Sequence, residues 1–194
     1  MDKYREYREH NRRVWDELTP VHYENPEYRV SEFLDGELTI DKVILDELGE
    51  VRGKKLLHLM CHFGLDTLTL ARLGADVTGV DFSEKSIRYA RSLQEKTQLA
   101  ARFIESDIYD LHLQCNEKFD IVFSSLGILA WLNDLDGWAK QIAGCLKPEG
   151  FFYLFEFHPI ALMFSKESED EPYFHSDEPM IYTDAVDYFD KEYK

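Results

Sequence analysis

The stretch from Leu56 to Ser83 constrains the fold more than any other part of the chain. It opens with an apolar run of strand length, passes through a turn and a leucine-rich segment that closes at Gly74, and ends with a second strand-like run that finishes at an acid, Asp81. Two such runs around a helix-length segment are typical of a βαβ unit. A unit of this kind binds ligands at the carboxyl edge of its strands.

The turn after the first of these strands limits the kind of ligand. A dinucleotide-binding turn has the pattern G-x-G-x-x-G, because a pyrophosphate must approach bare backbone at the start of a helix. Gly64 is the glycine that this turn offers, which argues against a nicotinamide-dependent dehydrogenase. Asp81 ends the second strand, where a carboxylate can accept hydrogen bonds from both hydroxyls of a ribose. A ribose site without a pyrophosphate site favours an adenosyl compound.

Two sequence runs carry a resemblance to a known family. The runs LHLMCHFGLDTL (57–68) and ARLGADVTGVDFS (71–83) resemble a mostly bacterial branch of the class I S-adenosylmethionine-dependent methyltransferases, whose substrates are mostly unassigned. The wider superfamily has an acid and three spaced glycines in the first run, and this chain has His58, Met60, His62 and Gly64 at those places. The acid of the second run, Asp81, is the stronger point of resemblance.

The resemblance implies both a fold and a cofactor. The fold is a Rossmann-like three-layer α/β/α sandwich with a mainly parallel sheet of about five strands in the order 3-2-1-4-5, and the cofactor is S-adenosylmethionine. In the family an acid after the third strand bonds the adenine amino group and the next apolar residue lies against the ring. The residues expected at the cofactor are His58, Met60, Cys61, Gly64, Asp81, Phe82, Asp107, Ile108, Ser124 and Ser125.

The N-terminal segment, residues 1–50, is expected to form a helical cap on a core that spans residues 51–160. Apolar and aromatic residues recur at helical spacing over residues 2–18, which predicts an amphipathic helix that Pro20 ends. This helix either packs on the domain or covers the cofactor as a lid. The resemblance makes three aromatic and histidine residues in this N-terminal segment candidates for substrate contact or catalysis: Trp15, His22 and Tyr23.

Further elements follow from capping residues and from alternation. A supporting helix is predicted over 39–48, with Thr39 as its N-cap and Gly49 as its stop. Ser83 can cap the helix that follows Asp81. The remaining strands are expected at 101–105, 118–125 and 151–157, with a turn at 146–150 before the last of them.

The segments after the fourth and fifth strands bear on the acceptor. Methyltransferases that act on amino groups of nucleobases or glutamine usually have Asn or Asp, two prolines and an aromatic residue after the fourth strand, and this chain has no such run there. Trp131 stands where the resembling family has an aromatic residue, so it is expected either to stack on a substrate or the sulfonium or to belong to the core. His158 follows the fifth strand and, with His22, is a candidate base.

Composition excludes several classes of partner. The formal net charge of −16 argues against nucleic acid and anionic membranes as partners, because phosphate contacts are made by clustered Lys and Arg. The three cysteines form no C-x-x-C pair, and the chain shows no leader and no apolar run of membrane-spanning length, so we expect a cytoplasmic protein with reduced thiols. Although His58, Cys61 and His62 are close in sequence, a fourth ligand is lacking, and we expect no metal.

The last residues, 161–194, form an acidic, aromatic-containing tail in place of the helix and the antiparallel strands with which the family continues. Strands six and seven are therefore expected to be missing, which leaves the flank of the fifth strand uncovered. The tail could fold back over this edge, or a homodimer could cover it. A gene fragment is equally compatible with the sequence.

Two functions from different classes remain. The first is a methyltransferase that uses S-adenosylmethionine to methylate a small-molecule acceptor. The second is a truncated or non-catalytic protein of the same fold that acts as a binding or interaction module. Affinity for the cofactor separates the two.

Overall fold

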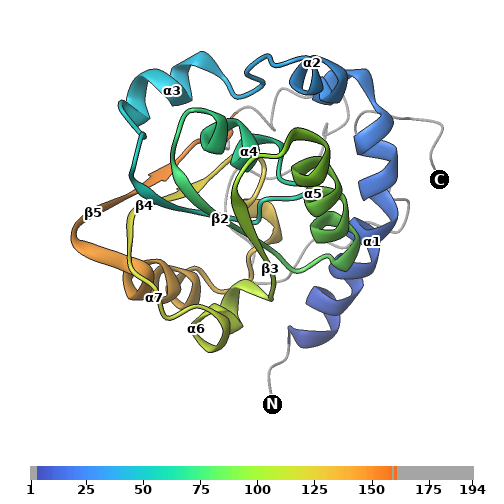
Figure 1. Ribbon diagram of the computed structural model, residues 1–194. Coiled ribbons are helices and arrows are strands. Elements are labelled where there is room, and N and C mark those ends of the chain that lie inside the picture. Colours follow the sequence, from blue (N-terminus) through green and yellow to red (C-terminus); the bar gives the residue numbers. More distant parts are fainter. Residues whose placement is uncertain (1–3, 159, 161–194) are drawn as a thin grey trace.

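The structure, a computed structural model, describes residues 4–158 and 160. Within these residues, five parallel strands form one sheet in the order β3-β2-β1-β4-β5 (Figure 1). The strands are β1 Lys55–Leu59, β2 Asp76–Asp81, β3 Ala101–Glu105, β4 Phe119–Ser124 and β5 Leu146–Leu154. The predicted strand order is confirmed. The tail, residues 161–194, lies outside the described residues, so the expectations for it and for strands six and seven stay predictions.

Helices cover both faces of the sheet and complete three layers (Figure 1). One face carries α3 Lys42–Leu48, α4 Leu65–Arg72 and α5 Glu84–Thr97, and the other carries α6 Leu111–Gln114 and α7 Leu135–Cys145. Leu57 and Leu59 of β1 pack toward α6 and α7, whereas Leu56 packs toward α3 and α4, and all three are fully buried. A central parallel strand that is covered on both faces needs such a continuous apolar run.

The N-terminal helix α1, Arg5–Glu24, runs beside α5 on the right of Figure 1. It continues past Pro20, so the prediction that Pro20 ends it is wrong. A proline inside a helix removes one hydrogen bond and costs ~3 kcal/mol or more. The buried side chains Leu18, Thr19 and His22 lie on both sides of Pro20 and hold the last turn on the domain. Two short elements follow that the sequence analysis did not predict: a 3-10 helix, η1 Pro26–Tyr28, and α2 Val30–Leu34.

Two other predicted boundaries change. The N-cap of α3 is Asp41, whose side chain accepts a hydrogen bond from the backbone N–H of Val43, so the prediction of Thr39 is wrong, whereas Gly49 ends the helix as expected. Strand β5 starts at Leu146 and ends at Leu154, earlier than predicted at both ends. The expected turn at 146–150 instead forms a bulge, because Phe119 pairs with Leu146 while Ile121 pairs with Phe151.

The described residues also bear on membranes and metals. None of the helices between residues 4 and 158 is long and apolar enough to cross a membrane. In the same part of the chain, no three His, Cys, Asp or Glu side chains gather so that they could hold a metal ion.

Candidate cofactor site at the carboxyl edge of the sheet

The turn after β1 has an unusual backbone. Met60, His62 and Gly64 all have positive φ angles, of 56°, 50° and 75°. Such angles are easy for glycine and cost other residues of order 1–3 kcal/mol each, so strain of this kind clusters at functional sites. The turn therefore keeps a shape suited to three spaced glycines, although two of the three positions carry side chains.

Asp81, at the end of β2, holds this turn in place. One carboxylate oxygen accepts a hydrogen bond from the backbone N–H of His62 at 2.8 Å, and the other accepts one from Ser83 at 2.9 Å. The side chain is 7% exposed, and burial raises its pKa to about 6. Asp81 thus joins the turn after β1 to the start of α5, where Ser83 is the N-cap, as predicted.

A small cavity lies beside Asp81, over the carboxyl ends of the central strands. Its volume is about 30 Å³, which is room for a water molecule or two and no more. Six residues that the sequence placed at the cofactor or the substrate line it together: Met60, Asp81, Phe82, Asp107, Ile108 and Trp131. The lining also includes residues that the sequence analysis did not single out, among them Arg8, Asn11, Ser106 and Tyr109.

Asp107 contacts the N-terminal helix directly. Its Oδ2 accepts a hydrogen bond from Arg8 Nε at 2.8 Å, and its Oδ1 accepts one from the backbone N–H of Tyr109. The Arg8 guanidinium also lies 5.1 Å from the centre of the Tyr109 ring. The first turn of α1 therefore lies over the acid that follows β3.

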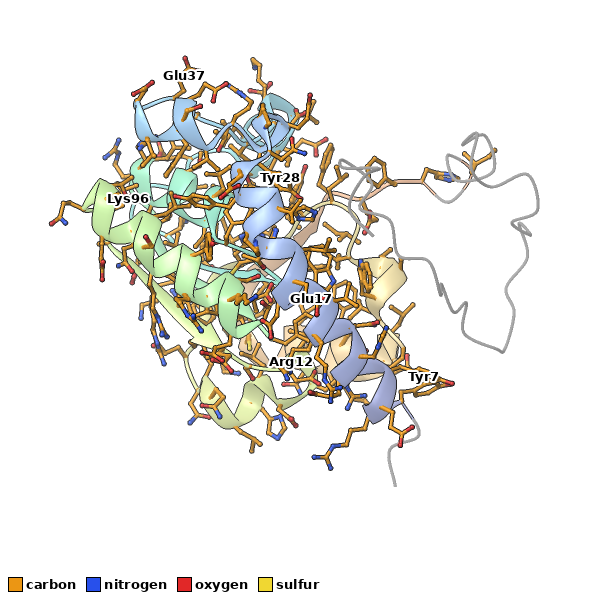
Figure 2. All side chains as sticks on the ribbon, turned by 90° about the vertical axis from the view of Figure 1, so that its right-hand side faces the viewer. Tyr7, Arg12, Glu17, Tyr28, Glu37 and Lys96 are labelled. Atoms are coloured by element: carbon orange, nitrogen blue, oxygen red, sulfur yellow. The ribbon has the colours of Figure 1, made fainter. Side chains whose placement is uncertain are left out.

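Two further contacts place α1 across the site, and Figure 2 looks onto this helix with Arg12 and Glu17 on it. Asp16 accepts hydrogen bonds from the Ser83 hydroxyl at 2.7 Å and from the backbone N–H of Lys85 at 3.1 Å, at the start of α5. Trp15 meets Trp131 edge to face, with 5.3 Å between ring centres. Since Trp131 lines the cavity, α1 closes it on this side.

Behind Trp15 lies a buried polar cluster that contains His22. His22 Nδ1 is 3.0 Å from His62 Nε2, and His62 Nδ1 is 3.0 Å from the Ser86 hydroxyl. The Tyr28 hydroxyl is 2.9 Å from His22 Nδ1. Burial, with a smaller effect of His22, holds the pKa of His62 well below its usual value. The cluster links α1 to the turn after β1 but does not line the cavity.

The other predicted residues have varied positions. His58 Nδ1 is 2.8 Å from the Thr67 hydroxyl and its Nε2 is 3.3 Å from the Ser125 hydroxyl, so it lies on the α4 side of β1. Cys61 is buried, and burial raises the pKa of its thiol well above the usual value. The Ser124 hydroxyl is buried and has no hydrogen-bond partner among the described residues.

Tyr23 and His158 also lie outside the cavity. Tyr23 packs against Phe63 and Tyr89, and its hydroxyl accepts a hydrogen bond from Lys96, which is labelled in Figure 2 near the C-terminal end of α5. His158 is exposed, and its Nδ1 accepts a hydrogen bond from the backbone N–H of Ile160.

Glu156, beyond the end of β5, positions the segment that carries Trp131. Its carboxylate accepts hydrogen bonds from the backbone N–H groups of Gly127 at 2.6 Å and Leu129 at 3.0 Å. Trp131 ends the 3-10 helix η3, Leu129–Trp131, that starts here. A charged acceptor therefore fixes the wall of the cavity.

We expect Glu156→Gln to destabilise the protein by ~1–3 kcal/mol, because one of these part-buried N–H groups would lose its acceptor and face an amide N–H. Urea unfolding followed by tryptophan fluorescence measures the change. Glu149→Gln, at an exposed glutamate, is the matched control and should change the stability little. Equal stability of the two variants would contradict the role of Glu156.

Comparisons with known proteins agree with this geometry. Residues 56–150 match the family model described as a methyltransferase domain. The chain is 27% identical over 158 residues to the ubiquinone biosynthesis O-methyltransferase of Bordetella avium. The aligned residues cover 79% of this chain and 60% of that protein. The chain spans 53% to 60% of the length of the first curated relatives that it matches.

Solved structures with a similar fold also include methyltransferases. An S-adenosylmethionine-dependent methyltransferase from Mesorhizobium loti is 29% identical, with a TM-score of 0.55 over 66% of this chain and 58% of that one. The T. thermophilus 16S rRNA N2 G1207 methyltransferase, solved with AdoMet and guanosine, is also 29% identical, with a TM-score of 0.50 over 61% of this chain and 35% of that one.

The strand order and the helices on both faces define a Rossmann-like domain, which has an acid-lined cavity at its carboxyl edge. With the family match, they identify residues 56–150 as a class I S-adenosylmethionine-dependent methyltransferase domain.

Proposed function

We propose that this chain binds S-adenosylmethionine in the cavity beside Asp81 and transfers its methyl group to a small-molecule acceptor. The observation that carries the proposal is the lining of the cavity: two acids, Asp81 and Asp107, with apolar residues such as Val80 and Ile108 between them. Carboxylates accept hydrogen bonds from hydroxyl and amino groups, and apolar side chains cover the faces of a base. This combination of hydrogen-bond acceptors and apolar side chains fits an adenosine.

Each cavity residue has a role under this proposal. Asp81 would accept hydrogen bonds from the ribose hydroxyls while it keeps its own backbone donors. Asp107 would accept one from the adenine amino group, with Ile108 against the ring. Because the cavity holds about 30 Å³, α1 and the Arg8 contact with Asp107 must shift when a nucleoside enters. Helix α1 would then act as a lid.

The chemistry requires little from the protein beyond alignment. When bound, the cofactor supplies an electrophilic methyl group on a sulfonium. Alignment of the reacting groups alone can supply as much as ~7–11 kcal/mol of barrier lowering. Trp131 and Trp15 would exclude water, and the face of Trp131 suits a sulfonium or a flat acceptor.

The acceptor is proposed to be a small molecule. The name of the Bordetella avium relative, an O-methyltransferase, favours a hydroxyl. A base would aid such a transfer by ~10²–10⁴-fold. His22 and His158 are the candidates, with His22 nearer to Trp15. The net charge of −16 disfavours RNA, although one structural relative is an rRNA methyltransferase.

A non-catalytic binding module is the second candidate, and the small volume of the cavity favours it. One experiment tests both candidates. The protein is incubated with S-adenosylmethionine and each of a panel of phenolic, carboxylic and amine acceptors or a short RNA, and mass spectrometry measures the S-adenosylhomocysteine that is released. Release with a small acceptor supports the enzyme. A folded protein that does not bind the cofactor, or that binds it without release by any acceptor, supports the module.

We expect Asp107→Ala to weaken S-adenosylhomocysteine binding by ~3–10-fold, because one hydrogen bond to the adenine amino group would be lost. Isothermal titration calorimetry gives the affinity. Asp110→Ala removes an exposed acid three residues away and is the control. If Asp107→Ala weakened binding more than Asp81→Ala does, the proposal that Asp81 contributes more to the affinity than Asp107 would be wrong.

A further inference from the structure

Asp66 is a further carboxylate at the carboxyl edge of the sheet. Asp66 lies in the first turn of α4, and its Oδ2 accepts a hydrogen bond from the Ser125 hydroxyl at 3.3 Å. Ser125 follows β4, so Asp66 reaches across the gap between β1 and β4. The strand order reverses at this gap, since β2 and β3 lie on one side of β1 and β4 and β5 on the other. Open α/β sheets bind their ligands at such a reversal.

A chain of hydrogen bonds orients this carboxylate. It runs from Thr67 to His58, from His58 to Ser125, and from Ser125 to Asp66. Burial lowers the pKa of His58 to about 3, so its ring is neutral and has one donor and one acceptor nitrogen. Ser125 has a single hydroxyl proton. If it donates that proton to Asp66, His58 must donate from Nε2 and accept from Thr67 at Nδ1.

Three other carboxylates at this edge, those of Asp81, Asp107 and Glu156, have a hydrogen-bond partner on each oxygen. Both oxygens of Asp81 accept backbone hydrogen bonds, and both oxygens of Glu156 do the same. Asp107 pairs with Arg8 and with the backbone of Tyr109. Asp66 is half-buried, and its Oδ1 accepts no hydrogen bond from any described residue. Its Oδ1 is therefore free to receive a cationic donor beside the gap between β1 and β4.

The ligand that reaches Asp66 follows from the proposed function, on which this step rests. An adenosine held by Asp81 and Asp107 occupies the ends of β2 and β3. The amino-acid end of the same molecule then extends over β1 toward β4, two strand spacings or ~10 Å from β2. That end carries an ammonium group, which needs an acceptor. We propose that the carboxylate of Asp66 binds the ammonium group of the cofactor's amino-acid end, held in position by Ser125 and His58.

Two ligands that differ only at the ammonium group isolate this contact. One is S-adenosylhomocysteine, and the other is its deamino analogue, in which hydrogen replaces the amino group. Calorimetry at pH 7 gives both affinities for the wild-type protein and for Asp66→Asn. Asp76→Asn is the matched control, because Asp76 is an exposed acid at the opposite edge of the sheet. Circular dichroism checks that each variant is folded.

We expect the wild-type protein and Asp76→Asn to bind S-adenosylhomocysteine at least ~10-fold more tightly than the deamino analogue, the range for a hydrogen bond between charged groups. Asp66→Asn should remove this preference and bind the analogue as well as the wild type does, within ~2-fold. A wild-type protein without the preference, or an Asp66→Asn variant that keeps it or loses both ligands equally, would overturn the role of Asp66. If the wild type binds neither ligand, the proposed function fails as well.

Discussion

Replacement of Asp81 by alanine should weaken the binding of S-adenosylhomocysteine by ~100-fold or more. A carboxylate that accepts hydrogen bonds from two ribose hydroxyls contributes ~1.5–3 kcal/mol through each of them, and alanine removes both. The loss should exceed that of any other single substitution in the cavity, because Asp81 is 7% exposed and water cannot take its place easily. Isothermal titration calorimetry measures the affinity directly.

Asp81 also has a structural part, which the experiment must separate. Its removal leaves the backbone N–H groups of His62 and Ser83 without their acceptor, at a cost of ~1–3 kcal/mol for each buried group. Unfolding in urea therefore accompanies the titration, and binding is compared below the transition. Asp76→Ala, on the exposed start of β2, is the control. Unchanged affinity in a folded Asp81→Ala variant would contradict the proposed contact between Asp81 and the ribose.

The second large effect is on stability. Gly64→Ala should lower the free energy of unfolding by ~2–5 kcal/mol, the sum of a left-handed residue with a side chain and an overpacked core. Gly64 has a φ of 75°, and a Cβ there would lie 2.6 Å from Phe103 Cε1 and 3.0 Å from Ala90 Cβ. Phe103 is itself buried at 6% exposure, so its ring has little room to withdraw.

Gly53→Ala separates the two causes. Gly53 has a similar φ of 72°, but a Cβ there meets nothing within 4 Å. This control should lose only the ~1–2 kcal/mol of the backbone term. Urea unfolding of both variants gives the difference between their free energies of unfolding. Equal losses of stability would show that the Phe103 ring moves aside and that packing against the turn after β1 is loose.

Much of the sheet could be predicted because its signals are local. The apolar run of β1 and the acid that ends β2 lie in the same short stretch, and the capping role of Ser83 depends on a residue three positions away. The turn after β1 shows the limit of this approach. Met60 and His62 break the glycine pattern in sequence, yet the backbone keeps the left-handed conformation at both positions. The residue types at positions 60 and 62 therefore do not reveal that the backbone is strained there.

The contacts missed in the site join distant parts of the chain. Arg8 and Asp107 are 99 positions apart, and no pattern in the N-terminal segment marks Arg8 as a partner of that acid. Glu156 binds backbone N–H groups, which every residue except proline has, so no residue type in the sequence marks its partners. The prediction that α1 ends at Pro20 is wrong because tertiary packing outweighs the local cost of a proline in a helix.

Titration of the whole 194-residue chain with S-adenosylhomocysteine in a calorimeter tests the central claim most directly. If the cavity beside Asp81 is a cofactor site, the protein binds one equivalent with micromolar affinity, after α1 releases Asp107. A protein that gives no heat of binding while circular dichroism shows an intact fold would contradict the claim.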